Sequence, residues 1–183
     1  MLFARSPEEC HLYMRLRPCA CGEEEFAWSE HLRQERGERV TSTYRGVCGS
    51  CAAERSFEFE VPAGPIKAAI YGAGDAPSKI IDPGEFLAVS SALAERLPDE
   101  PGELTPDELD DAIDALEMSV AALAEVLKFI PAGADAVPAE AFTSTRGTEL
   151  HRVEPERFTR ERLESALADR RAVLAAYEAA SSR

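Results

Sequence analysis

Four of the five cysteines lie in two close pairs. Cys19 and Cys21 are separated by one residue, and Cys48 and Cys51 by two. Two thiol pairs that the fold brings to one point hold a single metal ion tetrahedrally, and zinc is the usual occupant. Four protein ligands leave no open position for a substrate. The spacing therefore predicts a structural Zn²⁺ site made of Cys19, Cys21, Cys48 and Cys51.

Other uses of these thiols remain open at this point. Two disulfides would suit a secreted protein, and a redox-active pair at Cys48 and Cys51 would suit a βαβ fold, but the sequence has neither a leader-like start nor a βαβ pattern. The single spacer between Cys19 and Cys21 changes the N–H to sulfur bonds of a cysteine knuckle, so His11 is an alternative ligand. Cys10 stands apart and is expected to be a buried thiol.

Short runs of alternating apolar and polar residues fill positions 11–61, which is typical of half-buried antiparallel strands. Strands are expected at 11–17, 26–29, 40–47 and 57–61, with a polar turn at Arg33–Glu38. A meander in this order places both cysteine pairs at the same end of the sheet.

Residues 17–61 therefore resemble a zinc ribbon, a pair of β-hairpins with a cysteine knuckle at each tip. The resemblance implies a fold element and a bound zinc ion. It does not name a function, because zinc ribbons serve nucleic-acid-binding, protein-binding and purely structural roles.

Helix signals dominate the rest of the chain. Asp82 and Thr105 are each followed by proline and, three positions on, by glutamate, which is the pattern of a capping box. Apolar residues then advance by 4 and 3 from Leu109 to Ile130, and a last helix is expected from about 159 to 180. The predicted fold class is α+β, with a zinc-ribbon-like antiparallel sheet at 1–64, a Pro/Gly-rich connection at 65–81 that includes a short strand or turn at 66–71, and a C-terminal helical bundle at 82–183.

The acidic residues are concentrated in the middle of the chain. The formal net charge is −14, and residues 65–142 carry 16 Asp and Glu against 4 Lys and Arg. This segment repels phosphate backbones and attracts a basic protein, so a nucleic-acid partner is disfavoured. Five acidic residues lie at helical spacings on one flank, and they are the predicted partner-binding surface: Asp107, Asp110, Asp111, Asp114 and Glu117. A solvated helix face explains the same pattern.

The sequence favours a non-enzymatic protein-binding function, because its motifs assemble no catalytic set. In size and acidity it resembles bacterial immunity or antitoxin proteins, which neutralise basic toxins; this resemblance is one of physical type. A first alternative is a regulatory zinc-ribbon protein that contacts nucleic acid through Arg15, Arg17, Arg45 and Arg55. A second is an enzyme whose site lies between ribbon and bundle. The expected location is the cytoplasm, because no stretch approaches the ~18 apolar residues of a membrane span.

Overall fold

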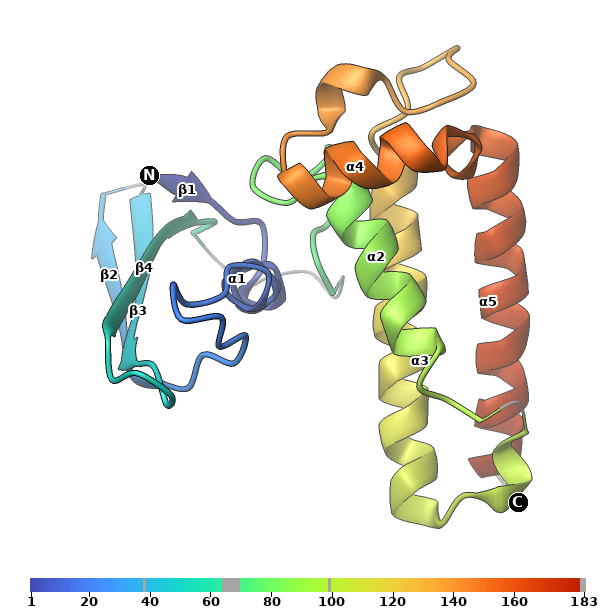
Figure 1. Ribbon diagram of the computed structural model, residues 1–183, viewed down its shortest axis with the longest axis horizontal. Coiled ribbons are helices and arrows are strands. Elements are labelled where there is room, and N and C mark those ends of the chain that lie inside the picture. Colours follow the sequence, from blue (N-terminus) through green and yellow to red (C-terminus); the bar gives the residue numbers. More distant parts are fainter. Residues whose placement is uncertain (38, 64–69, 99, 182–183) are drawn as a thin grey trace. The chain divides into compact units, whose positions relative to one another are not determined.

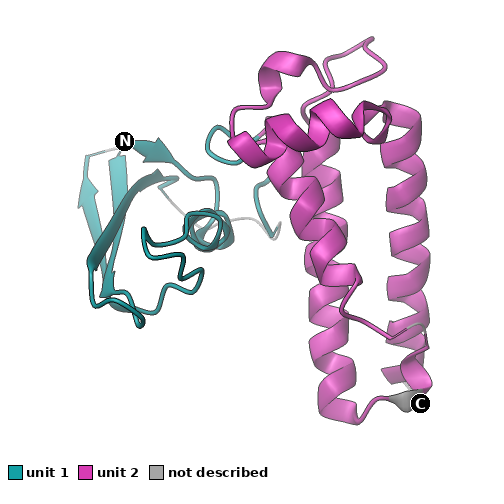
Figure 2. Ribbon diagram, viewed as in Figure 1, with its two compact units in different colours: residues 1–74, 78–81 teal, residues 75–77, 82–183 magenta. Residues whose placement is uncertain are grey.

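The computed structural model of the protein describes residues 1–183 except 38, 64–69, 99 and 182–183 (Figure 1). The chain forms two compact units, which are coloured separately in Figure 2. The first contains residues 1–74 and 78–81, and the second contains residues 75–77 and 82–183. The described strands belong to the first unit and the long helices to the second, so the mixed α and β character expected from the sequence is confirmed.

The first unit is built on a four-stranded sheet with the order β1-β4-β3-β2. Its strands are β1 (Leu2–Phe3), β2 (Trp28–Arg36), β3 (Arg39–Val47) and β4 (Glu54–Val61). Strands β2, β3 and β4 form an antiparallel meander, and β1 pairs in parallel with β4. The alternation predicted for 40–47 and 57–61 thus corresponds to β3 and β4.

The strand predicted at residues 11–17 is wrong, because residues 11–15 belong to helix α1 (Pro7–Arg15) and Leu16 is its C-cap. The Ser6 side chain accepts a hydrogen bond of 3.0 Å from the backbone N–H of Glu9, and Pro7 occupies the first turn. Cys10 and Met14, one helical turn apart, are both buried in the core of the sheet.

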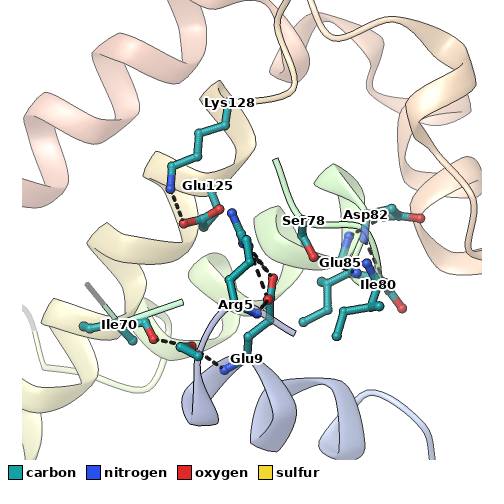
Figure 3. Close-up of polar contacts among 11 residues, drawn as sticks. Arg5, Glu9, Ile70, Ser78, Ile80, Asp82, Glu85, Glu125 and Lys128 are labelled. Atoms are coloured by element: carbon teal, nitrogen blue, oxygen red, sulfur yellow. Dashed lines mark hydrogen bonds and ion pairs between the residues drawn. The ribbon is translucent and has the colours of Figure 1, made fainter. Parts of the chain in front are cut away.

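A buried ion pair stabilises the start of α1. The Arg5 guanidinium lies 2.6 Å from a carboxylate oxygen of Glu9, whose side chain is fully buried (Figure 3). The backbone N–H of Arg5 donates to the same carboxylate at 2.6 Å. Glu9 thus satisfies backbone and side-chain donors at once, which is the condition for keeping a carboxylate in a core.

The polar turn predicted at Arg33–Glu38 is also wrong for its first four residues. Arg33–Arg36 continue β2, and the chain reverses at Gly37, whose φ of 62° lies in the left-handed region. Residue 38 lies outside the described part of the chain. The short strand or turn predicted at 66–71 falls mostly on residues outside that part as well.

The second unit contains α2 (Pro83–Ala94), α3 (Pro106–Leu127), α4 (Thr145–Val153) and α5 (Arg160–Ser181), with short 3₁₀ turns at Pro101–Glu103, Ala139–Ala141 and Pro155–Phe158. Helix α3 packs against both α2 and α5, and it runs opposite in direction to each (Figure 1). Both predicted capping boxes are present, at Asp82 with Glu85 and at Thr105 with Glu108. Among the described helices, none is long and apolar enough to cross a membrane.

The predicted apolar seam of α3 lies inside the bundle. Leu109, Leu116 and Leu123 are buried, while Ile113 and Val120 between them are half-buried. Helices α2 and α3 also contact each other through two buried serines, one on each helix. Each serine hydroxyl donates to the backbone carbonyl of the other residue at 2.9 Å: Ser90 and Ser119. The buried hydroxyls are therefore satisfied within the bundle.

Candidate metal centre

Two separate turns bring the four cysteines of the predicted zinc site together. Cys19 and Cys21 lie on the loop between α1 and β2, and Cys48 and Cys51 lie on the turn that joins β3 to β4. The four sulfur atoms lie within 4.8 Å of one another. The Sγ atoms of Cys19 and Cys51 are 3.6 Å apart, as are those of Cys21 and Cys48. This cluster is a site that can hold a metal ion.

The distances match tetrahedral thiolate coordination. With a zinc–sulfur bond of ~2.3 Å, two ligands of a tetrahedral site lie ~3.8 Å apart. The observed 3.6 Å is close to this separation. It is much longer than a disulfide bond of ~2.05 Å, and all five cysteines are free thiols. The four clustered cysteines therefore do not form the two disulfides that their spacing also allowed.

The two turns share one hydrogen-bonding scheme despite their different spacers. The backbone N–H of Gly22 donates to the Cys19 carbonyl at 2.8 Å, and that of Ala52 donates to the Cys48 carbonyl at 2.9 Å. The N–H groups of Cys19 and Cys48 donate to the carbonyls of residues 23 and 53 at 2.8 and 2.9 Å. The Cys19 turn is thus the Cys48 turn shortened by one residue, with its two closing bonds kept.

Each turn leaves the site through a residue in the left-handed region. Gly22 has φ 94° and Ala52 has φ 56°. Glycine adopts this conformation without penalty, whereas an alanine does so at a cost. The single spacer between Cys19 and Cys21 is therefore compatible with the knuckle, and the strained position lies in the turn with the usual spacing.

A hydrogen bond also joins the two turns directly. The Ser50 hydroxyl donates to the Glu23 carboxylate and lowers the pKa of Glu23. Neither residue belongs to a motif of its own. Ser50 lies inside the second cysteine pair and Glu23 lies two positions after the first, and this position is the only sequence signal for the contact.

Two of the thiols at the site, Cys48 and Cys51, differ in pKa. The pKa of Cys48 is lowered to about 7, chiefly because the backbone N–H of Cys51 donates to its sulfur. For Cys51 a backbone hydrogen bond from Ala53 acts in the lowering direction, but the other three thiols outweigh it and raise the pKa to about 12. Cys48 therefore loses its proton at a lower pH than Cys51 does. Cys19 and Cys48 are buried, and Cys21 and Cys51 are exposed, so the site lies at the protein surface.

The alternative ligand His11 and the separate thiol of Cys10 both lie outside the cluster. Within the described residues the ligand cluster contains no histidine, and the ring of His11 stacks on Trp28 at 6.0 Å between centroids. Cys10 is fully buried in the sheet core, as expected. Desolvation, followed by the nearby charge of Glu9, raises its pKa to about 12, so this thiol stays protonated and unreactive.

The arginines of the nucleic-acid alternative do not form one free basic face. Arg55 lies over the ring of Phe26 at 4.7 Å and donates to the backbone carbonyl of Arg17. Arg17 in turn covers the ring of Tyr13 at 4.5 Å. Arg45 forms an ion pair of 3.4 Å with Glu30. Three of the four arginines are therefore engaged within the first unit.

The acidic residues predicted to bind a partner all lie on α3 and are all exposed: Asp107, Asp110, Asp111, Asp114 and Glu117. They occupy the side opposite the buried seam of Leu109, Leu116 and Leu123. Among the residues that the structure describes, none of the five carboxylates forms an ion pair. Their role as a partner-binding surface stays a prediction.

Comparison with protein-family models, with curated proteins and with solved structures finds no match to this chain.

Proposed function

We propose that this chain is a non-enzymatic binding protein with a structural zinc ion in its first unit and a surface for a basic protein in its second. The four clustered thiols support the zinc ion. Four thiolates in tetrahedral reach of one point suit Zn²⁺ or an iron–sulfur centre. Two short knuckles facing each other, as in a zinc ribbon, favour a single ion, and the closed ligand set favours a structural role.

The exposed acidic face of α3 is the observation that carries the binding function. It combines five carboxylates on one flank of a single 22-residue helix, without an ion pair among the described residues. Such a surface offers unneutralised negative charge to a cationic partner, and it accelerates the encounter with that partner. A basic toxin neutralised by an immunity-type protein is the partner class that this charge suits best.

Metal content tests the first part of the proposal. We expect one zinc ion per chain in protein purified without chelators, measured by elemental analysis. Cys48→Ser is expected to lose the ion, because binding requires all four ligands and is coupled to folding of the unit. Cys10→Ala is the control, since it removes a buried thiol outside the cluster and is expected to leave the metal content unchanged. Iron, or protein without metal, would contradict the assignment of zinc.

Salt-dependent kinetics test the second part, once the partner has been identified by cross-linking and mass spectrometry. Replacing Asp107, Asp110, Asp111 and Asp114 by asparagine is expected to slow association and to remove much of its dependence on ionic strength. The matched control replaces four exposed glutamates of the first unit by glutamine and so makes the same change in net charge: Glu24, Glu25, Glu54 and Glu58.

Equal loss of association rate in both variants would mean that only total charge matters, and unchanged rates would return the α3 acids to ordinary solvated surface. A nucleic-acid partner bound through the first unit would instead favour the regulatory alternative.

A further inference from the structure

Strand β2 is a long sheet edge that is exposed on both faces. Within the described part of the chain it pairs with β3 on one side and with no strand on the other. All nine of its residues are exposed, including Trp28 at 43% and Leu32 at 40%. An edge of this length presents a row of unpaired backbone N–H and C=O groups, and another strand can satisfy them.

The register of the sheet fixes which side chains of β2 share a face. In the ladder, His31 faces Tyr44, Arg33 faces Ser42, and Glu35 faces Val40. These three β3 residues are buried on the side of the sheet that α1 covers, so their partners on β2 lie on that same side. Glu30, Leu32, Gln34 and Arg36 therefore lie on the outer side. A bulge between Trp28 and Glu30 interrupts the ladder, so the regular part of the edge begins at Glu30.

The charges along this regular part are arranged for self-pairing. The segment begins with Glu30 and ends with Arg36 on the same face. When two such segments align antiparallel about a twofold axis, each Glu30 faces Arg36 of the second copy, and each His31 faces Glu35. A parallel alignment would place like charges opposite each other.

We propose that β2 forms an antiparallel strand pair with β2 of a second copy of this chain, with Arg33 on the twofold axis. The two arginines at the axis repel each other, but each has a carboxylate of its own nearby, since Arg33 and Glu35 form an ion pair of 3.7 Å. The sheet then continues through both copies, and the edges of β2 are covered.

The charge distribution of the chain favours this face over the second unit as a meeting point. Residues 1–74 and 78–81 carry 10 basic and 11 acidic side chains, whereas residues 75–77 and 82–183 carry 10 and 23. Two copies therefore meet with less repulsion through the first unit. A single strand pair is a small interface, so the dissociation constant of the dimer is expected to be micromolar or weaker.

Sedimentation velocity of the full, metal-loaded chain across a concentration series tests the proposal. Wild-type protein is expected to shift from monomer to dimer with rising concentration. Glu30→Arg and Arg36→Glu each turn two cross-strand attractions into repulsions, so each variant is expected to dimerise at least about tenfold more weakly. Glu58→Arg makes the same charge change as Glu30→Arg on the outer face of β4, and it is expected to dimerise like wild type.

Mixing the two weakened variants is the decisive step. In an equimolar mixture, the arginines at positions 30 and 36 of one copy face the glutamates at 36 and 30 of the other, so dimers are expected to return. The double variant Glu30→Arg/Arg36→Glu is expected to dimerise on its own for the same reason. A wild-type chain that stays monomeric, a dimer unaffected by either single change, or a mixture that stays monomeric would each overturn the proposal.

Discussion

Replacing Asp82 by alanine should destabilise the second unit much more than the loss of a helix cap alone. Asp82 is 3% exposed and caps α2, where its Oδ1 accepts a 2.9 Å bond from the backbone N–H of Glu85. Its second oxygen accepts the backbone N–H groups of Thr143 and Ser144 at 3.0 and 2.6 Å. One carboxylate thus fixes both the start of α2 and the loop that leads into α4.

The magnitude follows from these three bonds. Loss of an N-cap side chain costs ~1 kcal/mol. Hydrogen bonds to a charged group contribute ~1.5–3 kcal/mol each, and we take ~1 kcal/mol for each loop bond because water replaces part of the loss at exposed Thr143. The expected total for Asp82→Ala is therefore ~3 kcal/mol.

The second capping box of the chain provides the matched control. Thr105 caps α3 in the same way and is exposed, and no bond to another element is recorded for it within the described residues. Thr105→Ala should therefore cost only ~1 kcal/mol. Urea denaturation followed by circular dichroism at 222 nm gives both values. If the two variants differ by less than ~0.5 kcal/mol, the loop bonds to Asp82 do not contribute to stability, which would refute this prediction.

Three further outcomes are expected. Leu116→Ala should lower the free energy of unfolding by ~2–5 kcal/mol and exposed Asp110→Ala by less than ~0.5 kcal/mol; equal denaturation midpoints would contradict the packing of the seam. Gly22→Ala should weaken metal retention against a chelator, because an alanine with positive φ is strained even where its Cβ meets no neighbouring atom. Ala52→Gly should strengthen retention, because it removes the same backbone strain from the second turn. The reverse order of the two variants would refute the role of these turns. The backbone N–H and hydroxyl of Thr105, the N-cap of α3, lower the pKa of Glu108. The stability that these two hydrogen bonds contribute is therefore present above the ordinary pKa of 4.5 and is lost as the pH falls through the lowered pKa. Urea midpoints measured across a pH series test this.

The helical unit was the more predictable part of the fold because its signals are local. Asp82 and Thr105 each satisfy a reciprocal cap within four residues, so the start of each helix is written in a short stretch of sequence. Helix α4 was not predicted, because no capping box marks its start. Its cap residue Ser144 is followed three positions later by glycine, and Gly147 is its only buried residue.

The N-terminal errors arose where two patterns compete. Leu12, Met14 and Leu16 alternate like a strand, but Ser6-Pro7-Glu8-Glu9 is a helix start of the kind recognised later in the chain, and it prevails. Arg33–Arg36 lack apolar alternation because β2 is exposed on both faces, so its strand character comes from backbone pairing with β3.

The four cysteines lie together as predicted, although the first pair does not follow the element that was predicted for it. The second pair lies on a hairpin turn between β3 and β4, as the meander predicted. The first pair follows a helix instead of a strand, and the loop after α1 brings it to the same end of the sheet. Pair spacing was thus a better guide to the site than the strand count.

The position of the thiol cluster along the chain has a consequence for biosynthesis. All four thiols lie at or before residue 51, and more than two-thirds of the 183 residues follow them. At a translation rate of ~5–20 residues per second, several seconds separate the completion of this ligand set from the appearance of α5. If the cluster holds zinc as proposed, zinc supply would act on the nascent chain, and a cell short of zinc would release defective new molecules while those already folded kept their ion.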